Sequence, residues 1–586
     1  MKTHLFALIL FLSIFGSAAA QDPTPSPTPT PSPVPVATPP VDDKQEVTPE
    51  KLQGVPAIAP NYSSEDRSLP DLGRVGVDMT DQRPLTLNEA VTLALENNKD
   101  IEVTRKNVRI AEYDLIAARG VYQPRLTGQT FYERSTVPNV SIFSTNQTTT
   151  QGSLVGNAGI TGYIPSFGTV LRGDFNNTRL TTNNPISILS PQNNANLTFS
   201  ITQPIFRGRS FDQNRRVIEI AKRNLSLTDV QFRQRSIDII AAVQRAYWDL
   251  TYALRNLQVQ RDGVRDAKDQ LGHSRRLVEE GQLAPIDIVA SETQVANFEQ
   301  AVYDALNVVT QAENVLKNLI APNRSDILWS ESVTPIDPVD IDPPRTTLTE
   351  ALAAAIQNRP ELEINQAQKD INAIDQRLYR ELKKPQIDLV ASYSSAGIGG
   401  SQNSDFNPNF PTACNVDPTS PACQQQQANL AALTGNPYSG IFTNKYPTYR
   451  VGVQFNLPLF GDKTAGAQLG RALVEGERLE VQREQIEQNI QVDVRNALQT
   501  LRTAEARLRA AAIARENSVR QYESEQRKLD NGQSDIYRVL ERQSALTAAR
   551  SNELRAQTEL NKAISDLQRA TGNSLKANNV VTMLTK

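Results

Sequence analysis

The 586-residue chain has little of the chemistry that enzymes and metal proteins use. Its only histidines are His4 and His273, and its only cysteines are Cys414 and Cys423. No second His or Cys lies near His273 in the sequence, so we predict no metal site and no cofactor. The sequence also lacks a Gly-rich phosphate loop and any set of residues that would assemble a catalytic nucleophile and base. These shortages argue against an enzyme.

Charge of one sign and long apolar runs are also scarce. The formal net charge of −3 provides no basic surface, so we expect no nucleic-acid partner. After residue 20, no stretch approaches the roughly 20 apolar residues that a membrane helix needs. Residues 1–20 resemble a secretory signal peptide, with Lys2 before an apolar run and three alanines before Gln21. We therefore predict an exported chain without a transmembrane helix.

The two cysteines lie close together in the segment CNVDPTSPAC. In an exported protein, a pair separated by a short loop that contains proline favours a local disulfide between Cys414 and Cys423 over two free thiols.

The most informative feature that is present is an internal duplication. Residues 87–102 read LNEAVTLALENNKDIE, and residues 348–363 read LTEALAAAIQNRPELE. The match continues without a gap to Pro124 in the first copy and Pro385 in the second. Further along, Gly281-Gln282 matches Gly532-Gln533. A repeat of this length indicates two large structural halves rather than a stack of small units.

The duplication divides the chain. The segment that follows the signal peptide opens with PTPSPTPTPSPVPV, which favours an extended, flexible chain that serves as a spacer or is simply a disordered tail. We predict the following parts: a flexible Pro-rich segment at 21–84, a first repeat at 85–321, a connector rich in Pro and Asp at 322–347, a second repeat at 348–575 and a tail at 576–586.

Both halves have the same predicted order of elements. In the first, a short helix ends before Pro124 and period-two alternation follows, for example in ANLTFSITQPIF. A helix of about 70 residues then runs from about 211 to 280, and a turn at 281–285 leads into a helix that ends near 320. The second half repeats this plan, with strands at IDLVASY and YRVGVQFNLPLF, a loop at 396–446 between them and a long helix that ends at Asp530.

The lengths predict two full-length helical rods in each half. In the first half, the helix that ends before Pro124 and the helix that ends near 320 together contain about 60 residues. Laid end to end, they cover nearly the whole long helix. An apolar row on the second long helix has a mean spacing of about 3.67 residues, which favours nearly straight packing. Its members are Ile486, Ile490, Val494, Ala497, Leu501, Ala504 and Leu508.

The strands predict an assembly of several chains. Four amphipathic strands cannot close into a barrel, but three chains with four strands each give twelve, so we predict a homotrimer in the outer membrane. An additional alternating pair between Ser153 and Leu180, around the turn at 165–168, leaves two possibilities. This pair forms either two more strands of the barrel or a hairpin outside the membrane. We favour the first, in which the hairpin is continuous with the sheet.

With these elements assigned, residues 85–575 resemble the TolC family of outer-membrane channels. The resemblance rests on LTLNEAVTLALENN and LTEALAAAIQNRPEL, on the strand-to-helix exits TQPIFRG and NLPLFGD, and on the turns RRLVEEGQLAPIDI and QRKLDNGQSDIYRVL. It implies a mainly α fold with two internal repeats, in which a trimeric twelve-stranded β-barrel in outer-membrane lipid continues into a periplasmic helical barrel. It also implies passive export in a tripartite efflux pump or type I secretion system, with a periplasmic adaptor and an inner-membrane transporter as partners.

The resemblance also suggests two functional zones. The turns at Gly281, Gln282, Gly532 and Gln533 correspond to the tips where the family docks its adaptor. Asp287, Arg538 and Glu541 correspond to the periplasmic entrance gate. Three copies of a carboxylate around a narrow opening attract cations. Arg538 departs from the acidic expectation, and we expect it to pair with Asp287 or Glu541, either in a gate or in a solvated salt bridge.

The rival class is a coiled-coil structural or adhesive protein of the cell envelope. That class explains the long helices and the export signal, but it does not explain amphipathic strands at matching places in both halves. The exported substrate cannot be chosen from the sequence.

Overall fold

The computed structural model describes residues 73–139, 147–339, 343–404, 406, 413–458 and 461–580. The predicted signal peptide and most of the predicted flexible segment lie outside these residues. The chain divides into two units at Leu72, and everything below concerns the unit that begins at Gly73.

The helices of the two halves correspond one to one. The first half has α2 (Leu87–Asn97), α3 (Lys99–Arg119), α4 (Gln213–Glu279) and α5 (Ile286–Ile320). The second has α6 (Leu348–Asn358), α7 (Pro360–Leu382), α11 (Lys463–Asp530) and α12 (Ile536–Ala570). The long helices contain 67 and 68 residues, which confirms the predicted lengths. Short helical turns are η2 (Gly120–Tyr122), η3 (Ile327–Trp329) and α13 (Ser574–Ala577).

Side-chain caps explain why the shorter helices begin where they do. The Thr86 hydroxyl accepts a hydrogen bond from the Glu89 amide at the start of α2, and Thr347 with Glu350 forms a capping box at the start of α6. A break separates the two short helices in each half, because Asn98 caps α3 and Pro360 occupies the first turn of α7.

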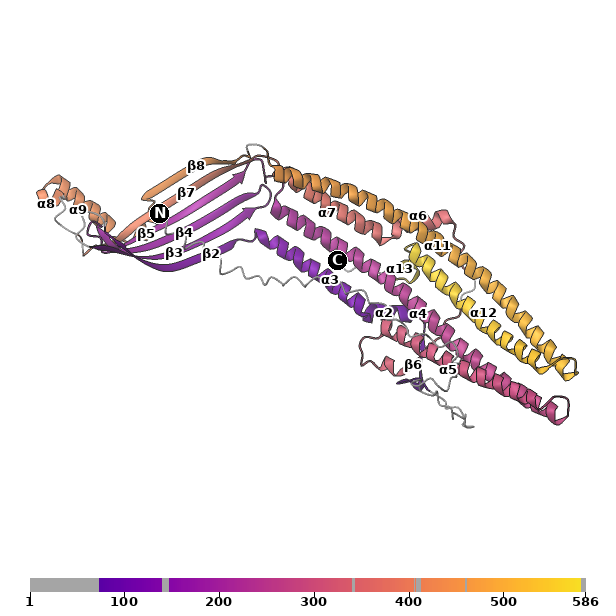
Figure 1. Cartoon of the computed structure of the whole chain (residues 1–586). Coiled ribbons are helices and arrows are strands. Elements are labelled where there is room, and N and C mark those ends of the chain that lie inside the picture. Colours follow the sequence, from indigo (N-terminus) through magenta and orange to yellow (C-terminus); the bar gives the residue numbers. More distant parts are fainter. Residues whose placement is uncertain are drawn as a thin grey trace, which may run out of the picture. The chain divides into compact units, whose positions relative to one another are not determined.

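The helices lie side by side in one layer (Figure 1). On one side of α4 lie α3 and then α5, and on its other side lie α7 and then α12. Helix α11 packs against α7 and α12, and at one point against α6. The short helices thus cover the long ones end to end, as predicted. The apolar row from Ile486 to Leu508 belongs to the core that joins α11 to α6 and α12.

The strands form one antiparallel sheet in the order β2-β3-β4-β5-β7-β8. Their bounds are Arg125–Pro138, Thr148–Ile164, Thr169–Thr182, Leu189–Pro204, Gln386–Gln402 and Tyr446–Asn456. Strands β3 and β4 are the additional alternating pair, and each is hydrogen-bonded on both sides. The predicted hairpin is therefore continuous with the sheet, and each chain has six strands in it.

The connection between β7 and β8 is partly helical. The predicted loop at 396–446 contains α8 (Ala413–Val416), α9 (Pro421–Leu433) and α10 (Pro437–Phe442), and the end of β7 takes its first residues. A disulfide joins Cys414 to Cys423. Helix α10 lies directly on β7, where a Cβ on Gly397 would meet the Pro437 carbonyl oxygen at 1.8 Å. Glycine permits this close approach because it has no side chain.

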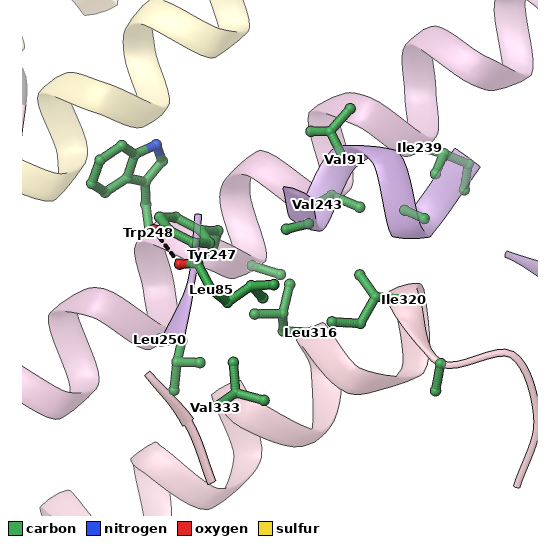
Figure 2. Packing of buried hydrophobic residues seen from close by; sticks show 14 of the residues in the cluster. Leu85, Val91, Ile239, Val243, Tyr247, Trp248, Leu250, Leu316, Ile320 and Val333 are labelled. Atoms are coloured by element: carbon green, nitrogen blue, oxygen red, sulfur yellow. Dashed lines mark hydrogen bonds between the residues drawn. The ribbon is translucent and has the colours of Figure 1, made fainter. Parts of the chain in front are cut away.

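A second, two-stranded sheet corrects the predicted division of the chain. Strand β1 (Asp78–Leu85) pairs in parallel with β6 (Glu331–Pro335). The prediction of flexible chain as far as residue 84 was therefore wrong for 78–84, and the connector at 322–347 also contains a strand. The local sequence gave no signal because the partner of Arg83 is Val333, far along the chain. In Figure 2, Leu85 and Val333 lie beside Leu250 and Leu316 in the core of the first half.

Candidate functional site

The two helical hairpins end in turns of the same construction. Gly281 has φ +75° and Gly532 has φ +68°, in the left-handed region that glycine enters without strain. The amide of Gln282 donates to the Leu277 carbonyl at 2.8 Å, and the amide of Gln533 donates to the Lys528 carbonyl at 2.8 Å. All four residues of the Gly-Gln pairs are exposed. The duplication therefore produces two matched, accessible tips, and the helices cannot continue past them.

A groove lies between α5 and α12 just above the tips. It has a volume of about 490 Å³, and its lining includes Ile286, Val289, Tyr537, Leu540, Glu541 and Ser544. Ile286, Val289 and Tyr537 are more than half exposed. This apolar surface was not predicted, although the apolar residues that directly follow each turn are visible in the sequence.

The three predicted gate residues occupy different surroundings. Glu541 is exposed and lines the groove. Asp287 lies in the first turn of α5, where its Oδ2 accepts a hydrogen bond from the Ala284 amide at 3.1 Å. Arg538 pairs with Asp535, with Nε 3.2 Å from Oδ2, and Asp535 also caps α12. The expected pairing of Arg538 with Asp287 or Glu541 was wrong, because a carboxylate three residues away on its own helix is closer.

The six-stranded sheet has one apolar and one polar face. Leu171, Phe199, Ile201, Tyr393 and Val451 come from four strands and line one apolar hollow. Residues paired directly across antiparallel strands point to the same face. The registers therefore place on this face Leu126, Tyr132, Leu154, Ile160, Phe175, Leu197, Val453 and Phe455 as well.

The opposite face carries amides and hydroxyls. One row across four strands consists of Gln129, Asn157, Asn176 and Asn196, each paired with the next. Charges on this face balance, with three arginines and three carboxylates. They are Arg125, Arg172, Arg450, Glu133, Asp174 and Asp388.

The sheet and the helical layer both end in uncovered edges. Among the strands that the structure describes, β2 and β8 each pair on one side only, so one backbone edge of each is open. On the helices, apolar side chains are exposed along α3 and α11, which lie at opposite sides of the layer. They are Val103, Ile110 and Ile116 on α3, and Val474, Val481 and Val492 on α11.

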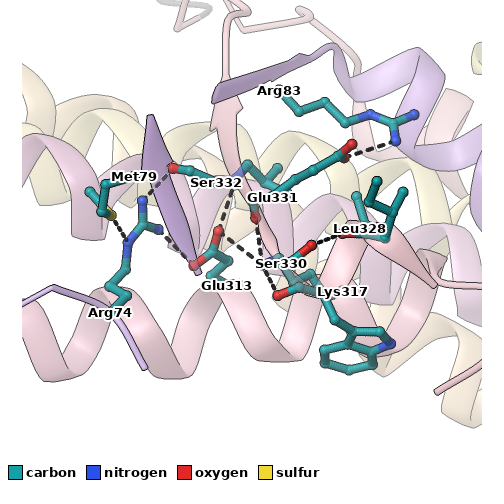
Figure 3. Close-up of polar contacts among 12 residues, drawn as sticks. Arg74, Met79, Arg83, Glu313, Lys317, Leu328, Ser330, Glu331 and Ser332 are labelled. Atoms are coloured by element: carbon teal, nitrogen blue, oxygen red, sulfur yellow. Dashed lines mark hydrogen bonds and ion pairs between the residues drawn. The ribbon is translucent and has the colours of Figure 1, made fainter. Parts of the chain in front are cut away.

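A buried ion cluster holds the start of the described chain against α5 (Figure 3). Arg74 Nη1 lies 2.6 Å from Glu313 Oε2, and Lys317 Nζ lies 3.3 Å from Glu313 Oε1. The Lys317 ammonium also donates to the carbonyls of Trp329 and Glu331, at 3.1 and 2.7 Å. Burial lowers the pKa of Lys317, and the Glu313 carboxylate opposes part of that shift. This cluster was not predicted from the sequence.

Tyr247 ties β1 and the connector to α4 nearby. Its hydroxyl lies 3.0 Å from the Leu85 carbonyl oxygen and also contacts the Asp337 carboxylate, so its one proton is shared between these two acceptors. Burial, followed by the hydrogen bond to Asp337, raises the pKa of Tyr247 well above its usual value.

None of the helices within the described residues has the length and apolar character to cross a membrane. The same part of the chain holds no cluster of three or more His, Cys, Asp or Glu side chains that could bind a metal ion.

An amphipathic antiparallel sheet joined to a layer of very long helices, in two matched halves, defines a channel protein of the outer membrane. The comparisons agree with this class. A family model described as outer membrane efflux protein matches residues 90–321 and 351–573, one segment in each repeat. The chain belongs to the outer membrane efflux protein family, whose members are transport proteins. Membership places the chain in the outer membrane, with the helices forming a periplasmic tunnel.

Solved structures share the fold. The Campylobacter jejuni CmeC outer membrane channel is 14% identical with a TM-score of 0.57, over 83% of this chain and 86% of that one. The open state of the Neisseria gonorrhoeae MtrE outer membrane channel is 16% identical with a TM-score of 0.54, over 83% and 89%. The outer membrane protein VceC from Vibrio cholerae is 13% identical with a TM-score of 0.56, over 83% and 96%. A search of curated proteins found no match.

Proposed function

We propose that three copies of this chain close into one conduit, which passively carries cargo from an inner-membrane transporter and a periplasmic adaptor to the outside. The observation that carries the proposal is that both layers end in uncovered edges. Strands β2 and β8 leave backbone donors and acceptors unpaired, and α3 and α11 leave apolar rows exposed. One neighbouring copy satisfies both needs at once, because β8 of one chain runs antiparallel to β2 of the next.

The first test is the mass of the purified protein in mild detergent, together with its conductance in a planar bilayer. We expect a trimer that conducts. A protein that remains a monomer and shows no conductance after reconstitution refutes the proposal. Such a result would favour the rival class, a coiled-coil structural or adhesive protein, which the family assignment otherwise argues against.

The adaptor is proposed to dock at the tips formed by Gly281, Gln282, Gly532 and Gln533. The apolar groove beside them supports this, because exposed apolar surface of this kind is typical of a protein interface. Val289→Asp should abolish export and co-purification with the adaptor while the trimer persists. Ile327→Asp is the matched control, because Ile327 is also exposed but lies in η3, away from the groove. Equal loss in both variants would contradict docking at the groove.

The entrance gate is proposed to involve Asp287, Arg538 and Glu541. Three exposed Glu541 carboxylates near the tips would favour cations in a narrow opening. Substituting Asp287 and Glu541 together with Ala should weaken the cation preference of the pore in bilayer recordings. Glu505→Ala serves as the control, since Glu505 forms an exposed ion pair with Arg509 on α11. Unchanged ion selectivity in the double variant would remove the gate assignment.

The same conduit could serve a tripartite efflux pump or a type I secretion system. Identifying the transporter that co-purifies with the trimer and its adaptor distinguishes these two roles, because the energy-coupling protein differs between them.

A further inference from the structure

We infer that the assembled barrel contains eighteen strands rather than the twelve expected from the family resemblance, and that its lumen is wide enough not to select cargo by size. The inference rests on the trimer proposed above and concerns the interface between β8 of one copy and β2 of the next. It follows from the six-stranded sheet of each chain.

The additional hairpin is built into the wall of the sheet. Strand β3 pairs with β2 from Arg125↔Thr161 to Pro138↔Thr148, and β4 pairs with β5 from Val170↔Thr202 to Leu180↔Gln192. Strands β2 and β5 are therefore separated by the hairpin along its whole length. A hairpin lying outside the membrane would leave β2 and β5 paired with each other.

Contacts at the closed end of the hairpin hold it over the start of α4. The Gln203 side chain donates from Nε2 to the Phe167 carbonyl at 3.1 Å. Gly168, with φ +69°, lies so close to Gly208 that a Cβ would meet the Gly208 carbonyl oxygen at 2.6 Å. The turn is thus fixed to the exit from β5 into α4, even though the hairpin itself connects to no helix.

The hairpin also matches the two faces of its neighbours. Leu154, Ile160, Leu171 and Phe175 continue the apolar face, while Asn157 and Asn176 continue the amide row on the polar face. Helix α10 lies on the apolar face, where Ser395 donates to the Ile441 carbonyl at 2.9 Å, and so leaves the amide row uncovered. A lipid-facing exterior and a wet interior therefore extend across all six strands, although the registers also place Arg134 and Arg179 on the apolar face.

The width of the helical layer accommodates six strands per chain. Four helices at about 9–10 Å between axes span an arc of about 38 Å. Six strands spaced about 4.8 Å apart and tilted by about 40° also span about 38 Å, whereas four strands span only about 25 Å. Six strands per chain therefore let the barrel and the helical ring have nearly equal circumference, and the chain passes from one to the other without narrowing.

The lumen that results is wide and neutral. With the same spacing and tilt, eighteen strands give a backbone radius of about 18 Å and twelve give about 12 Å. Subtracting about 5 Å for side chains leaves open cross-sections that differ by about threefold. The polar face offers short amides and hydroxyls with balanced charge, so it provides neither a size filter nor a charge filter. Selection must then occur in the helical part or at the transporter.

The test compares the full chain with a variant that lacks residues 139–182. The deletion removes β3 and β4 but keeps β2 and β5 antiparallel, so the variant should form a twelve-stranded barrel. Asn196→Cys, on the polar face of β5, is introduced in both backgrounds and reacted from outside with a maleimide polymer of width between the two lumens. Leu197→Cys, on the apolar face, is the matched control and should not be labelled in either.

We expect labelling of Asn196→Cys in the full chain and at least a tenfold slower reaction in the deletion variant. Electron microscopy of the unmodified trimer counts the strands directly and does not depend on folding of the variant; we expect eighteen. A trimer with twelve strands, or labelling that is independent of the hairpin, overturns this inference alone. The absence of any trimer overturns the proposed function itself, so the two failures are distinguishable.

Discussion

Replacing Glu313 with glutamine should release the start of the described chain from the helical layer. Glu313 is fully buried and accepts from three groups: the Arg74 guanidinium, the Lys317 ammonium and the Val333 amide. Glutamine preserves the shape and can still accept from the Val333 amide of β6. It leaves Arg74 and Lys317 buried beside each other without the carboxylate that balances them.

The expected cost follows from this loss of charge balance. Removing one partner of a buried ion pair typically costs about 3–5 kcal/mol, because the remaining charge is stranded away from water. We expect the lower value, about 3 kcal/mol, because Lys317 can release its proton. Every 1.4 kcal/mol is a factor of ten in an equilibrium constant, so local opening of β1 should become about 100-fold more frequent.

Amide hydrogen exchange of peptides covering β1 and β6 measures this opening directly. The matched control is Glu505→Gln, which removes an exposed pair with Arg509 and should cost less than about 0.5 kcal/mol. Burial places the folded-state pKa of Lys317 below its unfolded value, so the unfolded state binds more protons between the two. Raising the pH through that window should therefore reduce the defect of Glu313→Gln. Unchanged exchange in β1, or an equal change in the control, would refute the reasoning.

Three further predictions concern other parts of the chain. Gly532→Ala should lower the free energy of unfolding of the second hairpin by about 1–2 kcal/mol, because Gly532 has a left-handed φ. Gly272→Ala should instead raise stability by up to about 1 kcal/mol, because Gly272 lies inside α4 with open space around it. Thermal unfolding measures both changes. Because the folded-state pKa of Tyr247 is raised, its contribution to stability is complete below the unfolded pKa of about 10 and is lost as the pH rises above that value. Tyr247→Phe should abolish this alkaline loss of stability in exchange measurements of β1. Persistence of the loss would implicate another group. Replacing Cys414 and Cys423 together with Ser should destabilise the segment of α8 and α9 by about 2–3 kcal/mol and expose it to protease, while conductance stays unchanged; a loss of trimer would show that the disulfide supports more than this loop.

Much of the fold was predictable because its signals are local. The long helices α4 and α11 follow from extended helical periodicity without proline, and their ends follow from Gly281 and Gly532, which reverse the chain. The alternation in β5 identifies a strand with two different faces from its own residues. The candidate tips were found for the same reason, since a turn between two helices is marked by its own glycine.

The misses involve partners that are distant in the sequence or sites made by several elements. Strand β1 contains proline and charged residues and is stabilised by β6, whose residues lie about 250 positions away. The ion cluster joins Arg74 to Glu313, so neither residue predicts the other. The groove beside the tips exists only because α5 and α12 lie next to each other. The predicted ion pair of Arg538 was wrong for the opposite reason. Its partner in the structure, Asp535, lies only three residues away in the sequence and was overlooked.

The sequence by itself determined the long helices and the strands of the large sheet, that the plan occurs twice, and where the helices turn. Only the tertiary structure decided that the additional hairpin lies between β2 and β5, and hence that the large sheet of each chain has six strands. The physical reason is that alternation reports which face of a strand is apolar, whereas hydrogen-bonded pairing between strands depends on residues that meet only after the chain has folded.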